Sequence, residues 1–415
     1  MEEVFIRKIK VNEARNLKDF DIPLSDHEKK HLIITGKNGS GKTSLLNELK
    51  QFLNMSSNRG YLEQYDSQVR LLFNYTNQKK ILLADEVKNE QGISDTTDNI
   101  RNIEEWLEQL GGTFIVFNKP LLITEYFKEG KFIMGFFEAQ RNTTLHTPTG
   151  INKVELKPVY NINEKANHEF IQYIVNLKAD RSFAKDDNDL TAVHEIDEWF
   201  CNFELNLFEL FNSEGIRLEF DRKTYNFKII EQGKAPYNLN QLSGGYSAIL
   251  SIITELIMRM ETHKTKSYDV QGVVLIDEIE THLHVELQKK VLPFLISFFP
   301  KIQFIVTTHS PFVINSVENA VICDLEKRIV TEDLSGYSYD AIIESYFNSD
   351  KYSDVLKEKL EDYEQLVQKN TKSRSETEKL IEYKNYFKSI PKFVSDELAV
   401  KLQQIRMEEM SKKGN

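Results

Sequence analysis

Short apolar runs alternate with amphipathic stretches along most of the chain, and this alternation predicts an α/β fold. Three apolar runs, His31–Thr35, Val273–Ile276 and Phe304–Thr307, have the length and composition of buried strands. Leucines recur at helical spacing after the first run, in Thr43–Leu53, and a second amphipathic stretch, His284–Phe299, follows the second run. Strands and helices that alternate in this order favour a largely parallel sheet.

Further elements are predicted towards the N-terminus. We expect strands at Phe5–Val11, Thr113–Asn118, Leu121–Phe127 and Lys131–Phe137, and a hairpin turn at Glu129-Gly130 between the last two strands. The polar stretch from about residue 56 to residue 112 has a mostly helical pattern. The N-terminal part of the chain therefore combines strands with long helices.

The stretch from 148 to 238 departs from this alternation and predicts an inserted arm. It combines two helical patterns, His168–Lys178 and Thr191–Phe211, with a strand pair at Ile216–Asp221 and Asn226–Glu231, before a helix at Tyr246–Met260. After residue 335 the apolar residues become sparse and helical charge patterning begins. The chain is therefore expected to contain an N-terminal lobe (1–147), the arm (148–238), a C-terminal lobe (239–335) and a helical region suited to docking a partner (336–415).

The composition indicates a globular protein with a sizeable core, since 40% of its 415 residues are hydrophobic. A formal net charge of −11 argues against extensive coating of nucleic acid but leaves a local basic surface open. Cys201 and Cys323 have apolar neighbours, which predicts reduced core cysteines. The acidic N-terminus and a longest apolar run, Val291–Phe299, well short of the about 20 residues that span a bilayer, predict a cytoplasmic protein without a membrane segment.

A glycine-rich motif follows the first predicted strand. Residues 36 to 43 have the form G-x-x-x-x-G-K-[ST], in which backbone N–H groups surround phosphates, a lysine reaches the β and γ oxygens and a hydroxyl binds Mg²⁺. This motif alone leaves the class of NTPase open, but together with a second glycine motif downstream it predicts ATP and Mg²⁺ as cofactors. The predicted contacts in this loop are Gly36, Asn38, Gly39, Ser40, Gly41, Lys42 and Thr43, with Thr43 on the metal.

A second glycine motif, Leu242-Ser243-Gly244-Gly245, lies far downstream of Lys42. A transporter-type ATP-binding cassette would reach its second motif sooner, so the intervening arm argues against a transporter. The apolar strand that follows ends in Asp277 and Glu278, which brings two carboxylates to the edge of a sheet. Asp277 is expected to bind Mg²⁺, and Glu278 to orient and deprotonate the attacking water.

Two more polar residues follow predicted strands. His309, after Ile305–Thr308, is a candidate for contact with the γ-phosphate or the lytic water. Gln140, after Lys131–Phe137, is a candidate for contact with Mg²⁺ or water. Both positions suit a phosphoryl-transfer site at the edge of a parallel sheet.

The order of these motifs resembles that of ATP-binding cassette ATPases: Walker A, Q-loop, signature, Walker B and switch histidine. Two runs, Asp277-Glu278-Ile279-Glu280-Thr281-His282-Leu283-His284 and Thr307-Thr308-His309-Ser310-Pro311, are similar to those of SMC-like and OLD-like bacterial defence ATPases. Arg15, in an early arginine segment, resembles their nucleotide- or DNA-facing arginine. The resemblance covers about residues 1 to 335.

This resemblance implies a homodimer or higher oligomer that closes head to tail around ATP. Ser243, Gly244 and Gly245 of one subunit would then complete the site on Lys42 of the other. OLD proteins carry a Toprim nuclease after the ATPase, but no D-x-D pair follows His309 here. The resemblance therefore favours an ATPase subunit of the Septu, retron or PARIS type, which controls a separate nuclease, with an HNH nuclease favoured.

An SMC-like DNA-repair or DNA-tethering ATPase is the alternative function. It predicts direct, salt-sensitive binding to DNA that depends on ATP. Neither the trigger nor the effector can be read from the sequence, and direct contact with DNA stays open.

Overall fold

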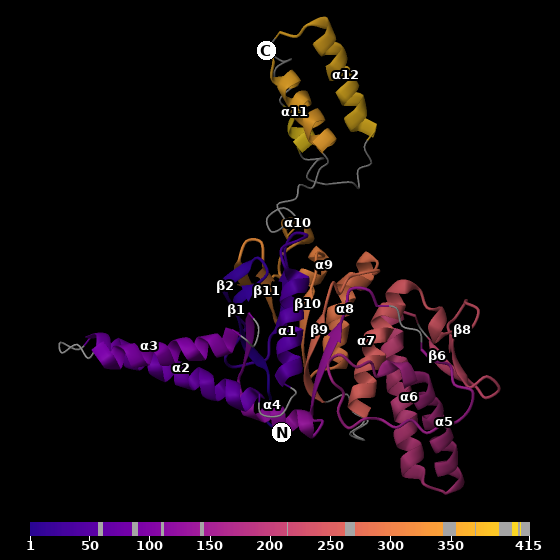
Figure 1. The fold of residues 1–415 in the computed structure, drawn as a ribbon. Helices are drawn as coiled ribbons and strands as arrows, with labels where there is room; N and C mark the ends of the chain where they lie inside the picture. The colour runs from indigo at the N-terminus through magenta and orange to yellow at the C-terminus, as the bar shows by residue number, and fades with distance from the viewer. Residues whose placement is uncertain are drawn as a thin grey trace. The chain divides into compact units, whose positions relative to one another are not determined.

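Figure 1 shows the computed structural model, which describes residues 1–56, 61–84, 90–108, 112–141, 145–213, 215–261, 270–342, 354–369, 371–389, 401–405 and 407. The chain divides into two compact units, Met1–Tyr337 and Ser338–Asn415. The first unit contains β1 (Ile6–Ala14), β2 (Leu17–Pro23), β3 (His31–Thr35), α1 (Lys42–Ser56), α2 (Tyr61–Ala84), α3 (Glu90–Glu108), β4 (Thr113–Phe117), α4 (Pro120–Lys128), β5 (Phe132–Phe137), α5 (Phe170–Asp186), α6 (Leu190–Phe211), β6 (Arg217–Asp221), β7 (Asn226–Ile230), β8 (Tyr237–Asn238), α7 (Gly244–Met260), β9 (Gln271–Ile276), α8 (Val285–Phe298), β10 (Ile302–Thr307), α9 (Pro311–Ile314), β11 (Ala320–Asp324) and β12 (Ile329–Glu332).

A six-stranded sheet in the order β12-β11-β3-β10-β9-β5 forms the centre of this unit. All neighbouring pairs are parallel except β11 with β12. Every residue of β3, β9, β10 and β11 is buried, as expected for parallel strands that are covered on both faces. The predicted α/β class with a mixed sheet is confirmed.

A second, antiparallel sheet has the order β2-β1-β4. Helix α1 contacts strands of both sheets, and its buried side chains Leu45, Leu46, Leu49 and Phe52 belong to one hydrophobic core with residues of β1, β3, β4 and β9. This packing fixes the N-terminus of α1 at the edge where the strands of the central sheet end.

Two helical hairpins extend this unit, α2 with α3 and α5 with α6, and in each the two helices run side by side (Figure 1). The small antiparallel sheet β6-β7-β8 follows α6 and leads to α7. The predicted helices in 168–178 and 191–211 and the predicted strand pair are confirmed.

A buried carboxylate of α7 binds residues 166 and 167, which lie in the predicted arm. Both oxygens of Glu255 accept the backbone N–H of Ala166, at 2.9 and 2.8 Å, and Oε2 also accepts the N–H of Asn167 at 2.9 Å. These residues lie just before α5, so Glu255 binds N–H groups that have no partner within a helix. The amide of Asn167 in turn donates to the backbone carbonyl of Ser251, at 3.3 Å.

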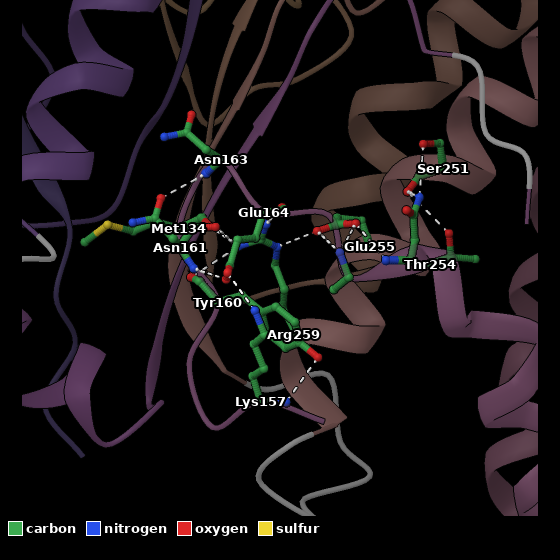
Figure 2. A network of polar contacts seen from close by, with 12 residues as sticks. Met134, Lys157, Tyr160, Asn161, Asn163, Glu164, Ser251, Thr254, Glu255 and Arg259 are labelled. Atoms are coloured by element: carbon green, nitrogen blue, oxygen red, sulfur yellow. Dashed lines mark hydrogen bonds and ion pairs between the residues drawn. The ribbon is translucent and has the colours of Figure 1, made fainter. Parts of the chain in front are cut away.

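Arg259, one turn further along α7, completes this network (Figure 2). Its Nε donates to Glu255 at 2.8 Å, and Nη1 donates to the carbonyl of Met134 in β5 at 2.8 Å. Its guanidinium also donates to the carbonyls of Asn161 and Glu164. Arg259 is only 4% exposed, so these acceptors compensate for the loss of hydration of its charge.

The prediction of a strand at 121–127 is wrong, because these residues form helix α4. Pro120 is at the first helical position, where its fixed φ suits a helix and its missing N–H costs nothing. Ile123, Tyr126 and Phe127 are buried, whereas Glu125 is exposed, which is a helical period. The predicted hairpin turn is also wrong, since it ends α4, with Gly130 at φ 70°.

Cys323 is buried in β11 as predicted, but Cys201 is exposed, so its assignment to the core is wrong. Cys201 is on α6 next to the buried Phe200 and Trp199. Neighbours in sequence point in different directions on a helix, and apolar neighbours therefore do not bury it.

The second unit contains α10 (Tyr339–Ala341), α11 (Asp354–Gln368) and α12 (Arg374–Ser389), with helical residues at 401–405. It has its own core, made of Leu360, Tyr363, Val367, Leu380, Tyr383, Phe387, Leu402 and Ile405. The predicted run of charged helices is confirmed, and its role in docking a partner stays a prediction.

Candidate nucleotide-binding site

The glycine-rich loop connects β3 to α1, as the motif requires. Gly36, Gly39 and Gly41 have φ of 136°, 82° and 100°, which side chains rarely adopt. A Cβ on Gly36 would also lie 2.9 Å from Oγ of Ser40. The loop therefore needs glycine for its turn, and it delivers the chain to the N-terminus of α1, where anions are favoured.

Lys42 is folded over this loop. Its Nζ donates to the carbonyls of Gly36, at 2.9 Å, and Lys37, at 3.1 Å. Burial lowers the pKa of Lys42, and the nearby carboxylates of Glu278 and Asp277 partly oppose that shift. The ammonium is therefore close to both the loop and the end of β9.

The loop fits a phosphate group. A Cβ on Gly39 would meet no atom within 4 Å, so the backbone there is open to a ligand. Oγ of Ser40 is buried and, within the described part of the chain, has no hydrogen-bond partner. A buried donor without a partner is costly, and a phosphate oxygen of a nucleotide bound in this loop would be an acceptor for it. Contact of Asn38 with the nucleotide stays a prediction.

Asp277 is the meeting point of two hydroxyl groups. Oδ1 of this buried carboxylate lies 3.3 Å from Oγ1 of Thr43 and 2.6 Å from Oγ1 of Thr307. Carboxylate and hydroxyl oxygens are the ligands that Mg²⁺ takes in nucleotide sites, where phosphates and water supply the rest. Within the described ranges, no group of three or more histidine, cysteine, aspartate or glutamate side chains could hold a metal ion.

Glu278 has an unusual backbone. Its φ is 44°, and a non-glycine residue in this region stores about 1–3 kcal/mol. Its N–H donates to Oγ1 of Thr307 at 2.7 Å, and its Oε2 accepts the hydroxyl of Thr281 at 3.2 Å. At this φ the chain leaves the direction of β9, and the half-buried Glu278 lies at the bend.

Arg141 is a functional candidate that sequence reasoning missed. Its guanidinium is buried and donates to the carbonyls of Glu138, Asp277, Glu278 and Ile279 at 3.2, 2.8, 3.0 and 3.1 Å. Burial lowers its pKa to about 10, so the group stays charged at neutral pH. In the sequence, its position directly after the predicted Gln140 was the signal that could have identified it. Gln140 itself is exposed, and its contact with the metal or water stays a prediction.

His309 follows β10 and is linked to Glu280. Its backbone N–H donates to Oε1 of Glu280 at 2.5 Å, whereas Oε2 of that residue is buried without a hydrogen-bond partner among the described residues. Burial, and then the charge of Lys42, lower the pKa of His309 below its ordinary value. The imidazole is therefore neutral at pH 7.

The signature residues lie at the start of α7. Ser243 is the N-cap, and its side chain makes no capping hydrogen bond. Ser243 and Gly244 are exposed, whereas Gly245 is buried against the chain, since a Cβ there would lie 2.9 Å from the carbonyl of His282. An exposed helix N-terminus with an uncommitted hydroxyl is suited to an anion from outside, and contact with a second subunit stays a prediction.

Arg15 lies in the exposed turn between β1 and β2, with φ of 55°. Leu17, two residues later, packs against the phosphate loop, 3.6 Å from the place where a Cβ on Gly41 would stand. The turn therefore adjoins the loop. A contact of Arg15 with nucleotide or DNA stays a prediction.

Comparison with known families decides the class of this site. Residues 32–315 match the model of the AAA_21 family, described as "AAA domain, putative AbiEii toxin, Type IV TA system". This chain belongs to the AAA_21 family. The matched range includes the phosphate loop, the signature motif, Asp277-Glu278 and His309, and it confirms the predicted ATPase class.

Curated relatives of this AAA_21 chain carry the names of defence systems. "Septu protein PtuA" of Bacillus mycoides (strain KBAB4) is 36% identical over 117 residues, which are 26% of this chain and 16% of that protein. "Retron Ec83 probable ATPase" of Escherichia coli is 32% identical over 142 residues, which are 31% of this chain and 26% of that protein. Both matches therefore span only a small part of the relative.

A longer match is to "Retron Vc95 probable ATPase" of Vibrio cholerae serotype O1 biovar El Tor, which is 23% identical over 386 residues, 76% of this chain and 75% of that protein. The predicted resemblance to Septu and retron ATPases is confirmed by these matches.

Solved structures with a similar fold include an SMC head bound to the C-winged helix domain of ScpA. The match covers 80% of this chain and 100% of that chain, with a TM-score of 0.38 and 14% identity. For the SMC head domain from Thermotoga maritima, the match covers 79% of this chain and 97% of that chain, with a TM-score of 0.36 and 12% identity.

Within the described residues, no helix has the length and apolarity required to cross a membrane.

Proposed function

We propose that this chain is the ATP-hydrolysing subunit of an antiphage defence system and that its nucleotide state controls a separate effector. The observation that carries the proposal is the meeting of Thr43 and Thr307 on one oxygen of Asp277, beside a strained Glu278. The Septu and retron names of the relatives support the defence context.

Each residue has a part in hydrolysis. Lys42 and Ser40 bind phosphate oxygens, and Thr43 with Asp277 holds Mg²⁺, which neutralises charge on the phosphates when bound. Glu278 takes a proton from the attacking water, whose oxygen bonds to the γ-phosphorus as the bond to the bridging oxygen breaks. The products are ADP and phosphate. Neutral His309 offers an N–H to the γ-phosphate.

The signature residues act on a second copy of the chain in this proposal. Ser243 and Gly244 are exposed at the N-terminus of a 17-residue helix, where the helix dipole favours an anion. In a head-to-tail dimer they contact the γ-phosphate of ATP bound to the partner. ATP therefore joins the two subunits, and hydrolysis separates them.

Mixing two inactive variants tests this arrangement. Lys42→Ala cannot bind phosphate, and Ser243→Arg blocks the signature surface, so each alone should lose hydrolysis. A mixed head-to-tail dimer keeps one intact site, and phosphate release should return to about a quarter of the wild-type rate. If the mixture stays inactive while each variant folds and Ser243→Arg still binds ATP, Ser243 does not act in trans. Inactive wild-type protein would contradict the ATPase itself.

The second unit is the proposed docking site for the effector, with an HNH-type nuclease favoured. Val355, Ile381 and Met407 are 59%, 54% and 64% exposed and lie outside the core of this unit. Replacing all three by lysine should leave the unit folded and abolish co-purification of the proposed nuclease effector. Retained co-purification would exclude this surface. ATP-dependent, salt-sensitive binding of DNA by the subunit alone would instead favour the DNA-tethering function.

A further inference from the structure

The end of β9 is held from one side by a single cation. Arg141 is 6% exposed, and its Nη1 and Nη2 donate to three consecutive carbonyls, those of Asp277, Glu278 and Ile279. Three carbonyls in succession can point at one group only when the backbone leaves the extended conformation. The bend occurs at Glu278, where φ is 44°.

We propose that Arg141 is a positioning residue that holds Glu278 in its strained, hydrolysis-competent conformation, an inference that rests on the proposed function of Glu278 as the base. Arg141 has no part in binding phosphate in this proposal. Thr307 fixes the N–H of Glu278, at 2.7 Å, and Arg141 fixes its carbonyl, at 3.0 Å. The peptide groups on both sides of the side chain are therefore immobilised, and the carboxylate direction follows from them.

Arg141 also links the segment that follows β5 to the segment that follows β9. It also donates to the carbonyl of Glu138, in the segment that leaves β5, and it directly follows Gln140. Because β5 and β9 are neighbouring parallel strands, one guanidinium joins the segments that follow both of them. A displacement of the 138–141 segment therefore changes the backbone that carries the base.

Arg141→Lys tests the proposal, since one ammonium cannot replace two nitrogens that each bind two carbonyls. The value of kcat for ATP hydrolysis should fall by about 10- to 100-fold, because small misplacements of a reacting group have effects of that size. The KM for ATP should change by less than about threefold, as expected when ground-state binding is kept. An unchanged kcat would overturn the inference, and so would an equal loss through KM alone.

Arg259→Lys is the matched control. Arg259 is 4% exposed and also donates to backbone carbonyls (Figure 2). It lies at the C-terminal end of α7, whereas the signature motif lies at the N-terminal end. It should lower the thermal stability as Arg141→Lys does and leave the kcat of the folded protein unchanged. If both variants lower kcat equally, the effect is general destabilisation and the proposal fails.

A double variant separates this inference from the proposed function. In a Glu278→Gln background the base is absent, so Arg141→Lys should not lower the residual rate further. A further loss of tenfold or more would show that Arg141 acts independently of Glu278. If wild-type protein hydrolyses ATP, Glu278→Gln leaves only a residual rate and Arg141→Lys keeps the wild-type kcat, the proposed function stands and only the positioning role is wrong.

Discussion

The hydroxyl of Thr307 lies 2.6 Å from Oδ1 of Asp277, and this contact joins the ends of the neighbouring parallel strands β10 and β9. The same hydroxyl accepts the N–H of Glu278 at 2.7 Å. One buried threonine thus contacts both the proposed metal ligand and the backbone of the proposed base.

Thr307→Val removes this hydroxyl with little change of shape. It leaves the N–H of Glu278 without its acceptor, so the free energy of unfolding should fall by about 1–3 kcal/mol, and ATP hydrolysis should slow. Chemical denaturation and phosphate release would measure the two effects. Thr254→Val is the control, because its buried hydroxyl bonds only within α7; it should leave hydrolysis unchanged.

The strain at Glu278 predicts different stabilities for two variants that are both inactive. Glu278→Gly and Glu278→Ala both remove the carboxylate and should abolish hydrolysis. Glycine adopts a φ of 44° readily and alanine does not, so the glycine variant should be more stable than the alanine variant by about 1 kcal/mol. Equal melting temperatures would show that the backbone at 278 is not strained.

Two buried glycines on neighbouring strands should respond differently to alanine. A Cβ on Gly272 of β9 would lie 2.3 Å from the carbonyl of Ile133, which the paired strands cannot relieve without moving apart. Gly135 of β5 has only ordinary contacts, at 3.5 Å and beyond. Gly272→Ala should therefore yield little folded protein, whereas Gly135→Ala should melt within a few degrees of wild type. Normal folding of Gly272→Ala would contradict the strand pairing.

His31 predicts a dependence of stability on pH. Burial lowers the pKa of His31 to about 3, and its Nδ1 accepts the N–H of Phe304 at 3.1 Å. Between the unfolded value near 6.5 and the folded value, the unfolded chain binds one more proton, so stability falls as pH falls through this window by about 1.4 kcal/mol per pH unit.

His31→Asn keeps an acceptor and removes the titration. Its free energy of unfolding should therefore lose less than that of wild type between pH 7 and pH 5, as measured by denaturation at each pH. Identical slopes for the two proteins would rule out His31 as the source.

The core of the fold was predictable from sequence because its signals are local. Buried parallel strands such as His31–Thr35 are short runs of apolar residues. Two of them, β3 and β9, are followed directly by Gly36 and by Asp277, which belong to the motifs of the site. Residues 121–127 were misjudged because Ile123, Thr124 and Tyr126 have strand propensity, whereas packing of one helical face and Pro120 decide the outcome.

The site residues that belong to a sequence motif were predictable, whereas those whose role depends on the backbone geometry of other segments were not. The phosphate loop and Asp277-Glu278 were identified from their sequence motifs. Arg141 and Thr307 act through carbonyl and N–H groups of other segments, and those contacts depend on the bend at Glu278, which leaves no pattern in the sequence.

Most hydrogen bonds that join residues 161–167 of the predicted arm to Glu255 and Arg259 of α7 involve main-chain atoms of the arm. Glu255 accepts N–H groups of residues 166 and 167, and Arg259 donates to the carbonyls of residues 161 and 164. Nearly every amino acid carries these main-chain groups. Residues 161–167 can therefore be substituted without a change of Glu255 or Arg259, as long as residues 166 and 167 are not proline.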